Sequence, residues 1–198
     1  MLLYNAPVSG NCYKVRLLLA HLGIEYDRHE VDVLDRSGRA QLLGSINPAL
    51  SVPTVVLDDG SPLAESNAIL WYFGEGTSYM PEDRLGRARV LQWLSFEQYS
   101  HQPYIALARY WLSIAHTPIA KEKIDARKPA GYAALDAIER HLHQRSFFVE
   151  ERYTIADIAL YAYTHVAHEG DFDLSGYPAI RAWLANVDAQ PGHVPITA

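Results

Sequence analysis

Along the first part of the chain, the spacing of apolar residues switches between the period of a strand and the period of a helix. Leu2–Asn5 is a short apolar run that predicts a strand. In residues 11–22, apolar positions recur every three or four residues, which predicts a helix that ends at Gly23. Residues 26–33 alternate as a second strand does. A strand, a crossover helix and a strand predict a βαβ unit with parallel strands.

The next stretch predicts a short helix, a hairpin and another helix. Residues 40–43 are helical in pattern, and residues 52–57 form a strand that begins near Pro53. Asp-Asp-Gly-Ser at 58–61 is a hairpin turn that leads to a return strand at 62–64. Residues 66–73 resume helical spacing.

Beyond residue 76 the pattern is helical to the end of the chain. Helices are predicted at 84–115, with Pro103 as a kink, at 120–142, at 153–166 and at 178–187. We therefore expect an α/β domain at 1–76, a linker at 77–84 and an all-helical domain at 85–198. The fold class is α/β plus all-α, in the order βαβ-α-ββα followed by helices.

Composition and charge narrow the classes of function. Of 198 residues, 49% are hydrophobic and 20% are charged, as in ordinary globular proteins. The net charge of −6 argues against a nucleic-acid partner, which needs a basic surface. No apolar run approaches the roughly 20 residues that cross a bilayer, so no membrane partner is expected. The single cysteine excludes an internal disulfide and indicates a reducing, cytoplasmic location.

Two short motifs suit an extended, peptide-like ligand. If the Val52-Pro53 bond is cis, the backbone of Val52 faces outward and can pair with such a ligand, whereas a trans proline would only begin a strand. Glu65-Ser66 precedes a helix, where Ser66 and the helix amides suit a carboxylate and Glu65 suits an amine. The same two residues are also compatible with a simple helix cap.

Three segments together resemble the thioredoxin-like domain of cytosolic glutathione transferases. They are S-G-N-C-Y-K-V-R at 9–16, N-P-A-L-S-V-P-T-V at 47–55 and D-D-G-S-P-L-A-E-S-N-A-I-L at 58–70. In the second half, Y-T-I-A-D-I-A at 153–159 resembles the capping box of the family's helical domain, in which Thr154 and Asp157 bond each other's backbone N–H. The resemblance covers nearly the whole chain and extends to a theta- or nu-like, bacterial type of active-site loop.

This resemblance implies glutathione as co-substrate and a cis proline at position 53. Val52 would pair with the cysteinyl backbone of glutathione, and Glu65 and Ser66 would receive its γ-glutamyl group. The implied glutathione-binding residues are Ser51, Val52, Pro53, Glu65 and Ser66. Ser51 stands where relatives often carry Lys, Arg or Gln, so the cation for the glycine carboxylate stays open between Arg39 and the helical domain.

The loop at residues 9–12 holds the candidates for thiol chemistry. Only a thiolate is a good nucleophile, and donors at a helix N-terminus lower the pKa of a thiol. The resemblance implies Ser9 as the catalytic thiolate-stabilising group and Asn11 as a second donor, although each also fits a cap or turn. Cys12 fits either a redox motif whose first cysteine is replaced by Ser9 or a buried position on the apolar face, and its alignment favours burial. Tyr4 is a weaker candidate, because packing of a strand explains it.

The electrophile site is expected on the helical domain. Tyr104, Ala108 and Trp111 lie at i, i+4 and i+7, which suits an apolar wall but is also typical of a core. No metal is expected, because His165 and His168 lack a third ligand. The sequence thus predicts a homodimeric transferase that stabilises the thiolate of glutathione and transfers it to a small hydrophobic electrophile. A glutathione-dependent disulfide reductase and a non-catalytic glutathione-binding module stay open as alternatives.

Overall fold

The structure is a computed structural model that describes residues 1–116, 118 and 121–198. Its contacts divide the chain into two compact units, one of residues Met1–Thr77 and Pro191–Ala198 and one of residues Ser78–Gln190. The sequence had placed the boundary at 76, the linker at 77–84 and the helical domain at 85–198. In the structure the C-terminal segment Pro191–Ala198 belongs to the first unit, although it follows the helices of the second.

The first unit is built around one mixed sheet. Its strands are β1 (Leu2–Asn5), β2 (Asp27–Glu30), β3 (Thr54–Val56) and β4 (Pro62–Ala64), in the spatial order β2-β1-β3-β4. β1 is parallel to β2 and antiparallel to β3, and β4 is antiparallel to β3. With α1 (Gly10–Leu22), α2 (Arg39–Leu43) and α3 (Ser66–Gly74), this is the predicted thioredoxin-like order. The fold class is confirmed.

Two strands are shorter than the alternation of the sequence predicts. β2 ends at Glu30, because Asp32 turns the chain by accepting the backbone N–H of Leu34 at 2.7 Å. β3 begins only after Pro53, which has no N–H to give to a ladder. Local backbone chemistry, a turn after β2 and a proline before β3, therefore shortens both strands.

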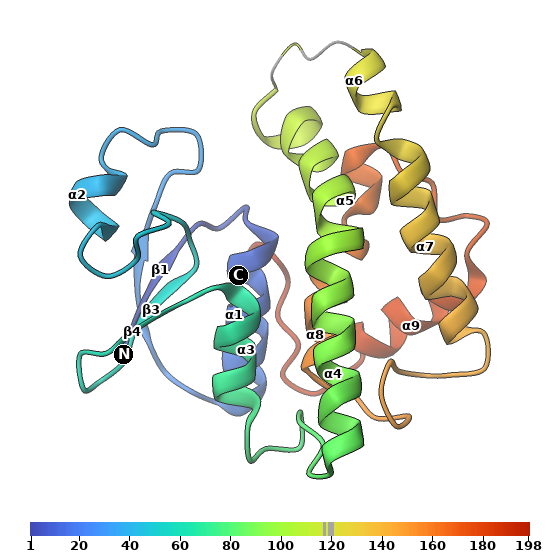
Figure 1. Cartoon of the computed structure of the whole chain (residues 1–198), viewed down its shortest axis with the longest axis horizontal. Coiled ribbons are helices and arrows are strands. Elements are labelled where there is room, and N and C mark those ends of the chain that lie inside the picture. The colour runs from blue at the N-terminus through green and yellow to red at the C-terminus, as the bar shows by residue number, and fades with distance from the viewer. Residues whose placement is uncertain (117, 119–120) are drawn as a thin grey trace. The chain divides into compact units, whose positions relative to one another are not determined.

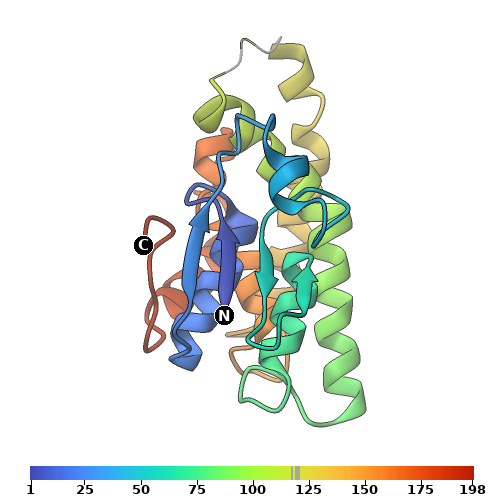
Figure 2. The ribbon, with the colours of Figure 1, turned by 90° about the vertical axis from the view of Figure 1, so that its left-hand side faces the viewer.

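Helices α1 and α3 pack against each other and on the same face of the sheet, while α2 lies on the other side (Figures 1 and 2). Apolar residues of β1, α1, β3 and α3 form one core between them: Leu3, Val15, Leu19, Val55 and Ile69. α1 ends at Gly23, whose φ of 63° is the left-handed conformation that glycine adopts easily. This packing fixes where the first turns of both helices lie.

The described part of the second unit is helical, with one isolated β-bridge between Val149 and Arg152. Its elements are α4 (Arg84–Phe96), η1 (Glu97–His101), α5 (Gln102–Arg109), η2 (Tyr110–Ile114), α6 (Lys121–Asp125), α7 (Lys128–Leu142), α8 (Ile155–Thr164), η3 (Ala167–Gly170) and α9 (Pro178–Asp188). No helix in the described ranges is long and apolar enough to cross a membrane.

α4 continues into α5 through a π-helical turn, η1, where the sequence predicts a kink at Pro103 (Figure 1). Proline cannot donate to the carbonyl four residues back, and its ring crowds that carbonyl. A wider π turn just before Pro103 accommodates both effects without ending the helix.

The capping box that begins α8 is confirmed and is tied to the core. Asp157 accepts the backbone N–H of its cap residue Thr154 at 2.8 Å, and it also accepts the N–H of Phe148 at 3.1 Å and Nε1 of Trp183 at 3.0 Å. Burial raises the pKa of Asp157 to about 6, whereas these donors favour its charged form. One carboxylate thus satisfies donors from three separate parts of the unit.

Replacement of Asp157 by alanine should destabilise the protein strongly. Several buried donors would lose their acceptor together, so we expect the free energy of unfolding to fall by about 3 kcal/mol or more. Urea unfolding measures the loss. Asp157→Asn keeps an acceptor oxygen of similar size and should lose clearly less, and equal losses in both variants would contradict this role.

Candidate active site

The first turns of α1 and α3 meet through side chains from two distant motifs. Ser66, at the start of α3, is 3% exposed, and its hydroxyl donates to Oδ1 of Asn11 in the first turn of α1 at 3.2 Å. The backbone N–H groups at both helix starts carry partial positive charge. The structure therefore brings together Asn11 and Ser66, which the sequence places in the thiol loop and in the γ-glutamyl subsite.

Ser9 occupies the N-cap of α1. Its backbone is extended, at φ −78° and ψ 121°, and its hydroxyl oxygen accepts the backbone N–H of Cys12 at 3.3 Å. A hydroxyl that accepts in this way keeps its own hydrogen for donation. Ser9 can thus serve as a cap and as a hydrogen-bond donor at the same time.

The segment before β3 presents a backbone edge at Val52. The Val52-Pro53 peptide bond is cis, as the family resemblance implies. Within the described residues, neither the N–H nor the C=O of Val52 has a hydrogen-bond partner. Both groups are therefore available to an extended ligand, which would satisfy them as a neighbouring strand does.

Asn47 organises the loop that leads to Val52. This side chain is 2% exposed, and its Nδ2 donates to the carbonyl of Ser51 at 3.0 Å and to Oγ1 of Thr54 at 2.9 Å. Leu50, between these contacts, has a φ of 52°, which is unusual for a branched side chain. The sequence shows Asn47 only as part of a turn, and its supporting role becomes visible with its partners.

Glu65 precedes α3 in a strained conformation. Its φ of 69° and ψ of 114° are uncommon for any residue with a side chain, and the side chain is exposed. Strain of this kind persists where the surroundings enforce it and is frequent at binding sites. The backbone thus holds a free carboxylate next to Ser66, as recognition of an amine requires.

Cys12 lies away from solvent, as its place on the apolar face of the helix suggests. It is 0% exposed, and its sulfur accepts the backbone N–H of Ala6 at 3.3 Å. Burial raises the pKa of the thiol to about 11, although the Ser9 hydroxyl and the Ala6 amide oppose the rise. A thiol in this environment is a poor nucleophile.

Arg16 holds the segment before the thiol loop through hydrogen bonds, a role that the sequence analysis missed. It is 1% exposed and donates to Oδ1 of Asn5 at 2.7 Å, to the carbonyl of Pro7 at 3.0 Å and to the carbonyl of Ile196 at 2.6 Å. The C-terminal segment thereby contacts the same guanidinium as the loop before Ser9. All four residues belong to the first unit.

Arg39, a candidate cation for the glycine carboxylate of glutathione, and Tyr4, the weaker candidate for thiol chemistry, both have contacts within the first unit. Arg39 is buried and donates to the carbonyls of Asp32 at 2.8 Å and Leu50 at 3.4 Å, so its guanidinium supports the loop that leads to Val52. The Tyr4 ring lies 5.3 Å from the ring of His29 on the neighbouring strand, which fits strand packing.

The three residues expected to form the electrophile site lie in the second unit. Tyr104 and Ala108 are in α5, and Trp111 is in the π-helical η2, whose wider turn shifts it from the α-helical face that the spacing predicts. Ala108 is 1% exposed, whereas Tyr104 and Trp111 are half-buried. The guanidinium of Arg127 lies 4.7 Å from the Trp111 ring centre.

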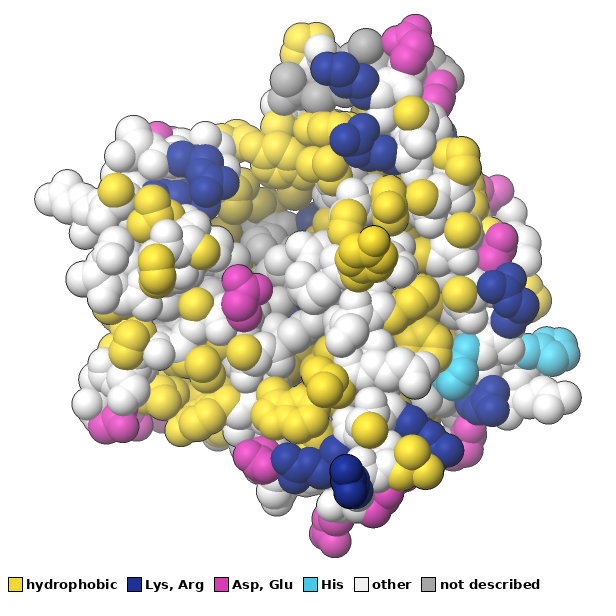
Figure 3. Space-filling model, in the orientation of Figure 1, with side chains coloured by type: hydrophobic (Ala, Val, Ile, Leu, Met, Phe, Trp, Pro, Cys, Tyr) yellow, Lys and Arg dark blue, Asp and Glu magenta, His cyan; other side chains and the backbone are white. Residues whose placement is uncertain are grey.

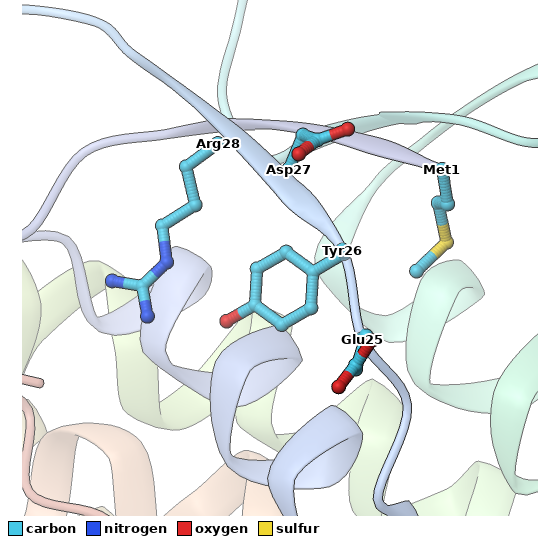
Figure 4. A pocket seen from close by; sticks show the side chains of 5 residues that line it. All are labelled: Met1, Glu25, Tyr26, Asp27 and Arg28. Atoms are coloured by element: carbon cyan, nitrogen blue, oxygen red, sulfur yellow. The ribbon is translucent and has the colours of Figure 1, made fainter.

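A metal site and a pocket away from the thiol loop are the other possibilities among the described residues. Among the described residues, no three His, Cys, Asp or Glu side chains are grouped so that they could hold a metal ion. In the first unit, a pocket of about 520 Å³ lies where β2 begins and is lined by Met1, Glu25, Tyr26, Asp27 and Arg28 (Figure 4). It contains none of the predicted site residues.

Comparison with known proteins agrees with this geometry. The family model for the N-terminal domain of glutathione S-transferase matches residues 8–75, and the model for its C-terminal domain matches residues 96–191. The crystal structure of a glutathione S-transferase from Pseudomonas fluorescens is 44% identical and has a TM-score of 0.94, with 100% of this chain and 98% of that chain covered.

Two curated relatives carry different activities in their names. Glutathione S-transferase D7 of Anopheles gambiae is 33% identical, over 96% of this chain and 88% of its own. Disulfide-bond oxidoreductase YfcG of Escherichia coli is 30% identical, over 96% of this chain and 90% of its own. The chain belongs to the glutathione S-transferase family.

The buried thiol of Cys12 should react slowly even at alkaline pH. At pH 9, a thiol with the ordinary pKa of 9.0 is half ionised, whereas a pKa of about 11 leaves about 1% thiolate. Because burial also keeps the reagent from the sulfur, labelling with a chromogenic disulfide at pH 9 should be at least roughly 50-fold slower in the folded protein than in urea.

The raised pKa also sets the sign of a stability effect. Because ionisation of Cys12 favours the unfolded chain, its contribution to stability is lost as pH rises from about 9 through 11. Cys12→Ala removes the only cysteine and is the blank for the labelling experiment. Rapid labelling of the folded protein would show that Cys12 is accessible and would reopen its redox role.

Proposed function

We propose that the protein is a glutathione transferase that stabilises the thiolate of bound glutathione and transfers it to a small hydrophobic electrophile. The observation that carries the proposal is the hydrogen bond from Ser66 to Asn11, which joins the two helix starts beside the Ser9 cap. Neutral donors at the positive ends of two helices suit a thiolate, because they lower the pKa of a bound thiol without requiring a base.

Glutathione would bind in an extended form across the first unit. Its cysteinyl backbone would pair with the unpartnered N–H and C=O of Val52, next to Ser51 and Pro53. Its γ-glutamyl carboxylate would face the start of α3 at Ser66, and its amine would face Glu65. These three contacts would place the thiol near Ser9 and Asn11.

The transfer step needs no further cofactor. The glutathione thiol gives its proton to solvent, and the resulting thiolate accepts hydrogen bonds from Ser9 and Asn11. The thiolate then forms a carbon–sulfur bond with the electrophile, and the leaving group departs with its electron pair. Tyr104 and Trp111 remain the proposed contacts of the electrophile, whereas Ala108, 1% exposed, packs towards Gly170 and is no longer proposed as a contact. Half-buried aromatic side chains suit a flat apolar substrate.

Reduction of disulfides is the second candidate function. The Ser9-Gly10-Asn11 spacing permits this reaction, and the similarity to Disulfide-bond oxidoreductase YfcG favours it. In that reaction the same bound thiolate attacks a disulfide sulfur and forms a mixed disulfide, while the other sulfur leaves as a thiolate. A non-catalytic module that only binds glutathione is the third alternative.

Two assays with the same glutathione-loaded protein separate these functions. Conjugation of a chloronitrobenzene supports the transferase, and glutathione-dependent reduction of a small disulfide without conjugation supports the reductase. Glutathione binding with neither reaction indicates the module. A protein that does not bind glutathione at all contradicts all three.

A homodimer in the cytoplasm completes this proposal. On α4 and the following turn, Leu85 is 59% exposed, Leu91 53% and Tyr99 85%. Figure 3 shows hydrophobic, basic and acidic side chains mixed over the N-terminal end of α4. A contiguous exposed apolar patch is typical of a surface that is covered in an assembly. We propose these side chains as part of the dimer contact, and sedimentation velocity measures the oligomeric state.

Ser9→Ala and Glu65→Ala should affect different kinetic constants. Loss of the Ser9 hydroxyl removes a donor to the thiolate, so kcat should fall by roughly 10- to 100-fold while the affinity for glutathione changes little. Loss of the Glu65 carboxylate should mainly raise KM for glutathione. Steady-state kinetics over glutathione concentration tests both, with Cys12→Ala as a control of nearly unchanged activity. Equal losses from Ser9→Ala and Cys12→Ala would contradict the assignment of Ser9.

A further inference from the structure

A buried lysine lies beneath the junction of α1 and α3. Lys14 is 0% exposed, and its Nζ donates to Oγ of Ser66 at 3.3 Å and to Oδ1 of Asn67 at 3.3 Å. Both partners are in the first turn of α3, where the backbone amides are already positive. Lysine is almost never fully buried unless its ammonium is paired with polar or charged groups.

The contacts of Lys14 continue to the thiol loop. The Ser66 hydroxyl that accepts from Lys14 donates in turn to Oδ1 of Asn11 at 3.2 Å. The chain of hydrogen bonds therefore runs from the Lys14 ammonium through Ser66 to the Asn11 amide. It joins the two subsites that the proposed function assigns to the γ-glutamyl group and to the sulfur.

The charge of Lys14 sets the direction of this chain. An ammonium can only donate, so the Ser66 oxygen must accept from it. A hydroxyl that accepts from a cation is polarised to give its own hydrogen onward. The nearby positive charge also favours the carbonyl end of the Asn11 amide towards Ser66 over its NH₂ end. The Asn11 oxygen is therefore turned towards Ser66, and its Nδ2 forms the opposite end of the amide.

We infer that Lys14 is a positioning residue that orients the Asn11 amide, through Ser66, so that Nδ2 donates to the thiolate of bound glutathione. This inference rests on the proposed function. Lys14 acts through Ser66 and Asn11 and does not itself contact the reacting sulfur. Binding of the γ-glutamyl group beside Ser66 and activation of the thiol at Asn11 then depend on the same side chain.

A double-mutant cycle between Lys14 and Asn11 tests the inference. The readout is the pKa of the bound glutathione thiol, followed by the ultraviolet absorbance of its thiolate across pH, which needs no electrophile. Lys14→Met and Asn11→Ala should each raise this pKa by about one unit, a roughly tenfold loss of thiolate near neutral pH. In the Asn11→Ala background, Lys14→Met should reduce the thiolate fraction by less than about a further twofold, because both substitutions interrupt the same chain of hydrogen bonds.

Lys14→Arg is the charge-retaining control: it differs from lysine in shape but keeps a cation with N–H donors, so the thiol pKa in this variant should stay closer to the wild-type value than in Lys14→Met. If Lys14→Met does not fold, as judged by circular dichroism, Lys14→Gln replaces it, which keeps similar length without charge. Losses that add fully in the cycle, or a thiol pKa unchanged by Lys14→Met, would overturn the positioning role.

The wild-type measurement separates this inference from the proposed function. A wild-type protein that binds glutathione without lowering its thiol pKa would remove the proposed thiolate stabilisation, and with it any role of Lys14 in it. A lowered thiol pKa in the wild type, together with additive losses in the cycle, would overturn the inference on Lys14 alone.

Discussion

The site depends on the packing of α1 against α3, which places the first turns of two helices side by side. The core residues Val15 and Ile69 hold the two helices together, and the bond from Ser66 to Asn11 closes their N-terminal ends. Each end carries backbone N–H groups without intrahelical partners. Lys14 adds an ammonium group there, which donates to Ser66 and Asn67 in the first turn of α3. The junction therefore favours an anionic ligand before any residue-specific chemistry is considered.

Around this junction, two strained backbone positions present the other binding groups. Leu50 has a positive φ in the loop that Asn47 holds towards Val52, and Glu65 has a positive φ immediately before α3. Each such conformation costs on the order of 1–3 kcal/mol, and the buried Asn47 contacts help to offset it for the first loop. A rigid frame is useful here because it reduces the ordering that an extended peptide would otherwise have to provide on binding.

The sequence predicted the order of helices and strands well, because apolar spacing reports which face of an element is buried. Cap and turn signatures marked Asn11 and Ser66 as the starts of two helices, and the family resemblance assigned them roles in the site. The sequence did not indicate that Lys14 and Arg16 support the candidate site. A lysine or arginine in a helix normally indicates an exposed face, and their burial is created by α3 and by the distant segment Pro191–Ala198. Likewise, Pro103 predicts a disturbance, but whether it becomes a kink or a π turn depends on the surrounding helices.

Conjugation and disulfide reduction would both use the thiol loop in the same way. Cys12 is the only cysteine of the chain and is buried with a raised pKa, so either reaction must use the sulfur of glutathione. Ser9 and Asn11 would stabilise that thiolate in the same way whether it next attacks carbon or sulfur. The two reactions differ in which second substrate is held and how long its product remains bound. Those properties would belong to groups outside the loop, for which Tyr104 and Trp111 are the proposed candidates, so one loop could serve either activity.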